Sequence, residues 1–459
     1  MKKIMSVLSF ALLLSANDAS TTHALSLNEA LELLDSQNLE IQAAKLDEKS
    51  AQQQIQSVSG MNWGKLTFTQ DVARSNDAGN VFGFKLTSRE ADFNDFGFDE
   101  FLAQMGGLPG NTNQLLATQP KNLNYPGYRN FYQSKLKYEV PLFTGFAISS
   151  YTNIMKEMKK IKSLDKEKIM TEKSYELRKS FYDMALLDSS IKNLKKILKN
   201  IETLENTTQT MIEVGYAKKV DLLEVKAKKG NVKRLLVQME ANQKLLYHYI
   251  SFLLNKKVEK IIPPLSEVPM PHFSDEEVLS RNIDIQKATT ALEIRKSMLD
   301  ANEAAYYPTV GAFGEVATAD DSFLGDASDH KAYTVGARLT WNIFNGGIDS
   351  AKIEQAKIEK MKMHTQVELA KKGIALKIAK IRTEIASQNA QIASLEKELE
   401  LANAIYENYE GRYKEKLVSM SDVIIKQSAQ IEKILQLQMA KNKRTEKIFE
   451  LEKIANGDK

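Results

Sequence analysis

Hydrophobic positions along this chain follow two periods, one typical of β-strands and one typical of long helices. Apolar and polar residues alternate most clearly over residues 333–343, and residues 132–142 repeat that pattern in the first half. Two less regular runs, at 65–73 and 309–317, complete four predicted strands. Strands of this kind suit a sheet tilted across a membrane, or a soluble hairpin packed on helices with the two faces reversed.

A second pattern predicts a very long helix after each second strand. In the second half the apolar seam advances in alternating steps of four and three, a period of 3.5 that implies left-handed coiling against neighbouring helices. At 1.5 Å per residue, the helix expected at 347–414 would measure roughly 100 Å. Shorter helices are expected at 26–59, 220–256, 274–303 and 421–454. The seam positions are Ile374, Ile378, Ile381, Ile385, Gln388, Ile392, Leu395, Leu399, Ala402, Tyr406, Tyr409 and Tyr413, and in the first half Leu177, Ser180, Met184, Leu187, Ile191, Leu194, Leu198 and Ile201.

The chain repeats one plan twice, in the order helix, strand, strand, helix, helix. Separate landmarks share an offset of 201 residues, and the start of each half shares an offset of 244, which pairs Asn38 with Asn282. The difference of 43 residues is extra chain between the strands of the first half, at about 75–130. The landmarks at offset 201 are Phe143 with Phe344, Gly145 with Gly346, and Asp221 with Asp422.

Composition removes several classes of function. Sixty-three basic and 59 acidic residues leave a formal charge of +4, which gives no electrostatic case for a nucleic-acid partner. The chain has no cysteine, and its five histidines show no ligand-like spacing, so we expect neither a metal nor a cofactor. Ser163 and Lys166 fit a serine–lysine pattern that is expected by chance in a lysine-rich helix. We therefore expect no enzymatic activity.

The N-terminus resembles a secretory signal. Lys2 and Lys3 precede an apolar run at 4–16, and Thr22-His23-Ala24 supplies small residues for cleavage. A short N-terminal anchor is the alternative. No later run reaches 18 apolar residues, so no membrane-spanning helix is expected. Four strands are too few to close a membrane barrel, and open edges in lipid are too costly, so several copies of the chain would have to share one barrel.

The doubled plan resembles the TolC family of outer-membrane channel proteins over about residues 25–456. The residues that carry the likeness are the two strand-to-helix junctions, Phe143 with Gly145 and Phe344 with Gly346, and the two helix-turn tips at 214–221 and 413–422. The resemblance implies a mostly α fold with a β-barrel: a homotrimeric, 12-stranded barrel in the outer membrane of a Gram-negative bacterium, four strands from each chain, continuing into a long periplasmic α-helical barrel. Such proteins are exit ducts of tripartite efflux pumps or type I secretion systems.

The resemblance also implies partners and a gate. The partners are outer-membrane lipid, a periplasmic adaptor (membrane fusion) protein and an inner-membrane transporter. The pore constriction at the periplasmic tip would be formed by Asp422 and Ile425, and the gate would be held shut by Asp221 and Tyr413. Adaptor contact would fall on Val214, Gly215 and Tyr216. A gate arginine and a second ring carboxylate of well-known members are replaced by Val418 and Ile425.

Simpler roles stay open at these positions. Each aspartate follows a turn, where it is favoured as a helix cap, and Gly215 suits a helix C-terminus. The whole chain could also be a periplasmic coiled-coil adaptor or structural protein, although an adaptor would be expected to have a single helical hairpin.

The predicted organisation is a signal peptide at 1–24, a periplasmic helix at 25–62, a strand pair with a long extracellular loop at 63–145, a long and a return helix at 146–262, a connector and helix at 263–306, a second strand pair at 307–346, and a long helix, return helix and C-terminus at 347–459.

Overall fold

A computed structural model describes residues 24–106, 112–264, 267–323, 325 and 329–456 of the chain. The predicted signal peptide lies outside these residues except for Ala24. The chain divides into two units, which are described separately. The helical unit comprises Met1–Glu48, Ile161–Thr289 and Gln366–Lys459, and the sheet unit comprises Lys49–Lys160 and Thr290–Thr365.

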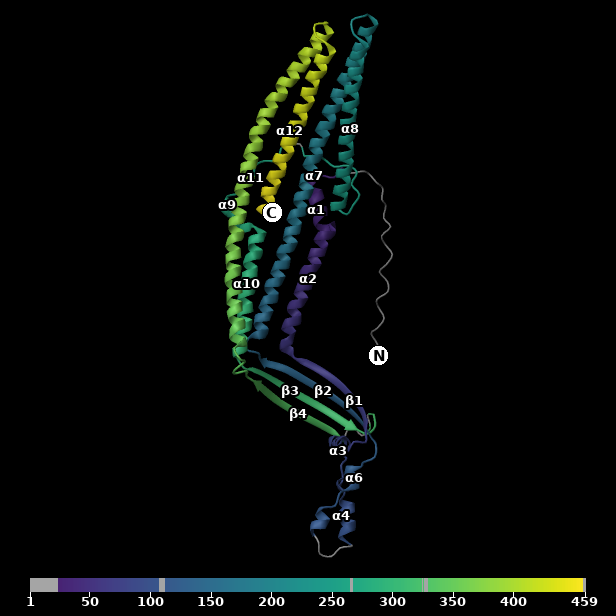
Figure 1. Ribbon diagram of the computed structural model, residues 1–459, viewed down its shortest axis with the longest axis vertical. Coiled ribbons are helices and arrows are strands. Elements are labelled where there is room, and N and C mark those ends of the chain that lie inside the picture. Colours follow the sequence, from purple (N-terminus) through teal and green to yellow (C-terminus); the bar gives the residue numbers. More distant parts are fainter. Residues whose placement is uncertain (1–23, 107–111, 265–266, 324, 326–328, 457–459) are drawn as a thin grey trace. The chain divides into compact units, whose positions relative to one another are not determined.

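The elements follow the predicted doubled order (Figure 1). Two helices of 67 residues each dominate the chain, α7 and α11. Where it is described, the long connection in the first half contains four short helices and a 3₁₀ turn. The elements are α1 (Leu27–Gln37), α2 (Leu39–Gly60), η1 (Met61–Trp63), β1 (Lys65–Ser75), α3 (Ala78–Thr87), η2 (Phe93–Phe96), α4 (Phe98–Met105), α5 (Thr112–Leu116), α6 (Lys121–Asn124), β2 (Arg129–Phe143), α7 (Ala147–Glu213), α8 (Lys219–Leu253), α9 (Asp275–Arg281), α10 (Ile283–Glu303), η3 (Ala304–Tyr306), β3 (Thr309–Asp320), β4 (Lys331–Thr340), α11 (Ile348–Lys414) and α12 (Met420–Ile454).

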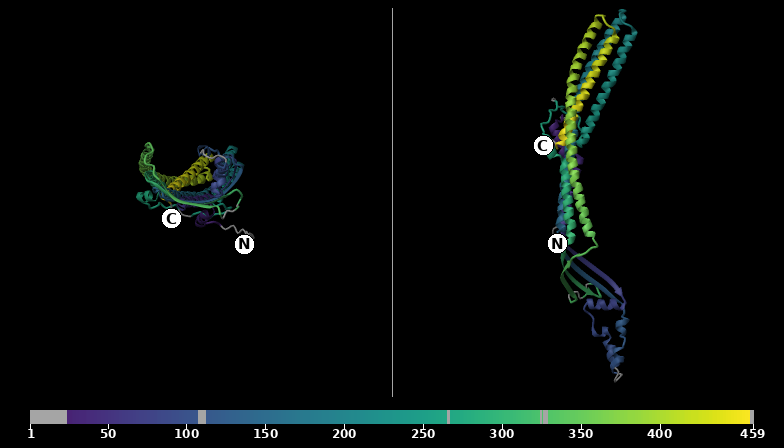
Figure 2. Two further views of the ribbon diagram at one scale, coloured as in Figure 1. Left: turned by 90° about the horizontal axis from the view of Figure 1, so that it is seen from below. Right: turned by 60° about the vertical axis from the view of Figure 1, so that its left-hand side comes forward.

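The sheet unit is built on one antiparallel sheet in the order β1-β2-β3-β4 (Figures 1 and 2). Pairing of β2 with β3 joins the two halves of the chain, while β1 and β4 each pair along a single edge in the described residues. Strand β4 ends at Thr340, so the predicted strand was too long at its end. The indole nitrogen of Trp341 donates to the carbonyl of Tyr306 at 3.1 Å, which directs this side chain toward the η3 turn.

The helical unit has a core in three clusters, and two of them are copies of each other. One packs residues of α1, α2, α7 and α8, and the other packs residues of α9, α11 and α12. The third joins α7 and α8 to α11 and α12. All positions of the predicted seam are buried or half-buried, which confirms the heptad register. Residues in the first core and their counterparts at the predicted offsets are Leu34 and Val278, Leu177 and Ile378, Met184 and Ile385, Ile250 and Leu451, and Leu253 and Ile454.

The opening helix of each half is broken in two, where a continuous helix was predicted. Asn38 separates α1 from α2, and Asn282 separates α9 from α10; both have extended backbone angles. The Asn38 amide donates to the carbonyl of Leu253 at 2.8 Å while its oxygen caps the next helix by accepting from the Ile41 amide at 3.0 Å. Asn282 does the same with Ile454 and Ile285. The break exists because each buried asparagine ends one helix and begins another.

No helix in the described part of the chain combines the length and the apolar character that crossing a membrane would require.

Candidate functional site

One face of the sheet is apolar on all four strands and open to solvent. Cross-strand pairing aligns Leu66, Tyr138, Gly314 and Val335 in one row. The next row on this face consists of Phe68, Leu136, Val316 and Tyr333. Tyr333 and Val335 are 82% and 77% exposed, fractions that a soluble sheet seldom leaves on large apolar side chains in register.

The opposite face of the sheet is polar and carries ion pairs. The Lys135 Nζ lies 3.3 Å from Glu315 Oε1 on the neighbouring strand, and Lys137 Nζ lies 2.8 Å from Glu139 Oε1. The Arg338 guanidinium lies 5.9 Å from the centre of the Phe313 ring. Charge on one face and exposed apolar residues on the other is the alternation of a sheet that separates lipid from water.

The two strand-to-helix junctions differ in their surroundings. Gly145 has φ +60°, and a side chain at this position would meet the Ala304 carbonyl oxygen at 2.7 Å, so a glycine is required on both counts. Phe143 packs edge-to-face on Phe146. At the second junction Gly346 also has positive φ, but Phe344 is 82% exposed. Gly145 and Gly346 therefore lie at the turns before the long helices, whereas Phe143 is the last residue of β2 and Phe344 follows β4.

Both helix tips turn through a residue in the left-handed conformation. In the first tip this is Gly215 at φ +81°, after which the Tyr216 amide closes the helix by donating to the Met211 carbonyl at 2.7 Å. The position 201 residues later is Lys416 at φ +66°, so the same turn is formed there by a residue with a side chain. Val214 and Tyr216, predicted to meet an adaptor, are both exposed.

Replacing Gly215 with Ala is expected to destabilise the first tip, since a Cβ in this conformation is unfavourable by about 1–2 kcal/mol. Hydrogen–deuterium exchange of residues 205–225 should accelerate about 5- to 30-fold by that energy. Gly230→Ala is the matched control: Gly230 lies within α8 with open space around it, so alanine there should stabilise the helix by about 0.5–1 kcal/mol. Equal exchange in the two variants would refute the strained-turn assignment.

Asp422 completes a capping box at the start of a return helix, and Asp221 forms one half of such a box, because its N-cap residue Lys218 has no side-chain acceptor. An Asp221 oxygen accepts from the Lys218 backbone amide at 2.8 Å. Asp422 accepts from both the amide and the hydroxyl of Ser419, at 3.1 and 2.6 Å. These bonds, the Ser419 hydroxyl first, lower the pKa of Asp422, so its carboxylate is charged at neutral pH. Capping is thus observed at both aspartates, and it leaves a pore role open.

Tyr413 is buried between the tips. Its hydroxyl lies 3.3 Å from the hydroxyl of Thr208 on α7. Burial, assisted by the negative charge of Asp221, raises the pKa of Tyr413 and keeps the phenol neutral. Two turns earlier on α11, the Tyr406 hydroxyl accepts from the buried Gln427 at 3.3 Å. Ile425, in contrast, is 60% exposed on α12. Tyr413 therefore connects α11 to α7, whereas the side chain of Ile425 is open to solvent on the surface of α12.

Contacts between the two tips include residues that the sequence did not single out. The ammonium of Lys416 lies 3.5 Å from the centre of the Tyr216 ring. The Ser421 hydroxyl donates to Glu224 at 2.6 Å, and Lys228 donates to the Ser428 hydroxyl at 2.5 Å. A lysine two residues before Val418 thus supplies a cation at the tip. The 201 offset from Gly215 was the signal that could have identified it.

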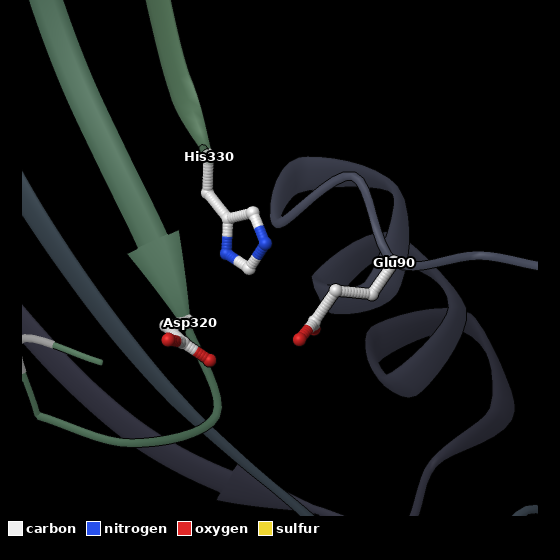
Figure 3. Close-up of side chains that lie close together, drawn as sticks. All are labelled: Glu90, Asp320 and His330. Carbon is white, nitrogen blue, oxygen red and sulfur yellow. The ribbon is translucent and has the colours of Figure 1, made fainter. Parts of the chain in front are cut away.

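A second group was also missed, at the far ends of the strands from the junctions. Glu90 follows α3, Asp320 ends β3 and His330 precedes β4, and one ligand atom of each lies within 4.8 Å of the others (Figure 3). Spacing along the chain gives no sign of this group, because His330 has no other histidine at a ligand-like distance in the sequence. The cluster forms through the path of the long first connection, which the sequence pattern left undetermined.

Comparison with known proteins identifies relatives for both sequence and fold. Residues 276–457 match the family described as outer membrane efflux protein. MdtQ of Escherichia coli strain K12, an outer membrane protein named for multidrug resistance, is 26% identical over 175 residues. MdtQ of strain CFT073 is 25% identical over the same length. The matched stretch covers 36% of this chain and 36% of each relative.

Solved structures extend the likeness to nearly the whole chain. CusC, whose structures were solved to follow its folding and transmembrane channel formation, superposes with a TM-score of 0.76. The match covers 94% of this chain and 92% of CusC, at 14% identity. VceC from Vibrio cholerae scores 0.74 over 94% and 96%, also at 14% identity. The open MtrE channel of Neisseria gonorrhoeae scores 0.73 over 94% and 89%. These structures confirm the predicted fold of the chain and disfavour the adaptor alternative, which was expected to have a single helical hairpin. The family match over residues 276–457 agrees with the predicted family resemblance.

Proposed function

We propose that this chain, which belongs to the TolC family of outer membrane efflux proteins, is one subunit of a trimeric exit duct. Three copies of the four-stranded sheet would close a 12-stranded barrel, with the apolar face in lipid and the charged face toward the channel. The long helices of three chains would form the periplasmic part of the duct. The duct is passive and serves an efflux pump or a type I secretion system.

The exposed apolar face carries this proposal. It spans all four strands in register, and the sheet that bears it ends in two strands paired on one side. Unpaired backbone groups are too costly in a bilayer, so both edges need partners there. A second copy of the same sheet can provide them, because β1 of one chain can pair with β4 of the next in a closed ring.

The partners follow from the doubled tips. An exit duct needs an energised transporter in the inner membrane, and the chain has no Gly-rich phosphate-binding loop of its own. We propose that a periplasmic adaptor joins the two and docks on the exposed tip residues Val214 and Tyr216. Gly215 shapes that surface through its turn.

The experiment that tests this function is the native mass of the full chain, extracted with detergent from the outer-membrane fraction, followed by conductance in planar bilayers. We expect about three times the mass of one chain and a discrete single-channel conductance. A monomer that is released without detergent, or a trimer that conducts no ions, would reject the exit duct.

The gate is proposed to lie at the second tip. In the trimer, three copies of Asp422 would form a carboxylate ring, with three copies of Ile425 as an apolar constriction beside it. Asp221 and Tyr413 would hold the tips together in the closed state. The Asp422 side chain is half-buried and its pKa is lowered, so a ring of three would carry negative charge at neutral pH.

Replacing Asp422 with Asn is expected to reduce the cation selectivity of the channel, since three negative charges leave the constriction. The reversal potential in a salt gradient measures this. In the unmodified channel the selectivity should persist at neutral pH and decline only as the pH falls through the lowered pKa of Asp422. Glu277→Gln is the control, because Glu277 completes the same kind of capping box with Ser274 at α9, away from the tips. A reversal potential that both variants leave unchanged would confine Asp422 to capping.

A further inference from the structure

The cluster of Glu90, Asp320 and His330 has the composition and the arrangement of a metal site. The three side chains come from different segments and converge on one space (Figure 3). One ligand atom of each lies within 4.8 Å of the other two, and rotamer adjustments bring such atoms to the separations found around a bound cation. Asp320 is 8% exposed and the other two are half-buried, so the space is partly shielded from solvent.

His330 is oriented as metal-binding histidines are. Its Nδ1 lies 3.2 Å from the carbonyl oxygen of Ala319, a bond in which Nδ1 carries the proton and donates. That tautomer leaves the lone pair of Nε2 for a metal, and a backbone carbonyl is a common partner for the remote nitrogen of a ligating histidine. The position of the His330 ring is therefore fixed by a bond to Ala319, the residue before Asp320 on β3.

Glu90 is held in place by two neighbours through the same oxygen. Its Oε2 accepts from the Ser88 hydroxyl at 2.8 Å and forms an ion pair with Arg129. Oε1 is then the oxygen that faces a cation. Arg129 lowers the net negative charge of the cluster, so two carboxylates, one guanidinium and a neutral imidazole sum to −1, which still favours a divalent cation.

We propose that Glu90, Asp320 and His330 bind one divalent transition-metal cation of the Zn²⁺ class. One imidazole nitrogen and two carboxylate oxygens are a donor set typical of Zn²⁺, whereas Mg²⁺ and Ca²⁺ are bound mainly by oxygen. The three ligands leave a fourth position for water. This proposal does not depend on the exit-duct function, since it rests on side chains at one end of the sheet unit.

The bound cation would fasten the long first connection to the second hairpin. Glu90 lies three residues after α3, and α3 packs on the start of β2 by stacking Phe84 on Phe131 with 4.2 Å between ring centres. Phe131 lies on the charged face of the sheet, since it alternates with Tyr132 along the strand. Metal binding at Glu90 would thus hold α3 over that face, at the strand ends away from the junctions.

Zinc uptake by the full chain tests the proposal. The protein is purified in detergent with an affinity tag that contains no histidine, stripped with a chelator and titrated with ZnCl₂. We expect one Zn²⁺ per chain, unaffected by excess Mg²⁺, and at least about tenfold weaker binding in His330→Gln and Asp320→Asn. His364→Gln is the matched control because His364 is exposed on α11, and it should bind as the unmodified protein does.

A second measurement follows the fastening itself. Zn²⁺ should slow proteolysis of residues 76–128 in the unmodified protein and in His364→Gln, but not in His330→Gln, while native mass and circular dichroism show that each variant is folded. Uptake below one equivalent, equal uptake in His330→Gln, or uptake without protection of that segment would overturn the proposal. If uptake stays below one equivalent, or is equal in His330→Gln, the three residues form a network of charged and polar groups that binds no metal.

Discussion

Replacing Val335 with Arg is expected to prevent assembly of the protein in the outer membrane. Val335 lies in the middle of β4 on the apolar face, with Gly314 opposite it on β3. An arginine on the lipid face near the middle of a bilayer destabilises a membrane strand by about 2–4 kcal/mol. This corresponds to about a 30- to 1,000-fold shift toward the unassembled state for each chain, and a trimer would carry the substitution three times.

The matched control is the adjacent residue on the other face. Thr334 lies opposite Glu315, so an arginine there gains a partner of opposite charge and remains in water. The measurement is the amount of trimer recovered from the outer-membrane fraction for each variant. If Thr334→Arg abolishes assembly and Val335→Arg does not, the two faces of the sheet have been assigned the wrong way round.

Periodic features of the sequence predicted most of this fold. The heptad seam succeeded because a helix packed along its whole length must keep one apolar stripe, so each seam position is constrained by burial. Strands β2 and β4 were recognisable for a similar reason, since a sheet with one apolar and one polar face alternates along each strand, whereas the alternation in β1 and β3 is less regular. The repeat offsets of 201 and 244 carried each landmark of one half onto the other.

Features that depend on single residues were harder to predict. Asn38 and Asn282 were used as repeat landmarks, yet their role in breaking a helix requires a carbonyl more than 170 residues away, which no local pattern reveals. Lys416 occupies a left-handed turn that ordinarily selects glycine. Glu90, Asp320 and His330 meet only because of the particular path taken by the long connection, and irregular chain has no period from which to infer contacts.

The candidate tip site was predicted by resemblance and its local geometry by the rules of helix capping. Both aspartates accept hydrogen bonds at the start of a return helix, as the simpler alternative required, and the lowered pKa keeps the half-buried Asp422 carboxylate charged. The pore role depends on neighbouring copies of the chain. Capping and gating are therefore compatible: a carboxylate fixed by Ser419 has a defined position at which three chains can form a ring.

Replacing Asn38 with Ala is expected to destabilise the helical unit locally, at the point where α1 and α2 meet the end of α8. The substitution removes a helix cap, which is worth about 0.5–2 kcal/mol, and deprives the buried Leu253 carbonyl of a donor, at about 1–3 kcal/mol. The combined loss of about 1.5–5 kcal/mol should accelerate hydrogen–deuterium exchange at residues 39–44 about 10- to 5,000-fold. Asn242→Ala, at an exposed position within α8, is the control and should change exchange little.

Asn38→Asp separates the two contributions. An aspartate keeps the oxygen that accepts from the Ile41 amide, but its second oxygen faces the Leu253 carbonyl in place of a donor. The position is 3% exposed, so burial would disfavour the charged form and raise the pKa of this carboxyl. The variant should therefore be least destabilised below the ordinary aspartate pKa of about 3.9, where the protonated group can donate, and lose stability as the pH rises through the raised pKa. Protection from exchange, measured relative to the intrinsic exchange rate at each pH, that does not change with pH in Asn38→Asp would indicate that the Leu253 contact contributes nothing. Asn282→Asp provides an independent repeat of the test in the second half.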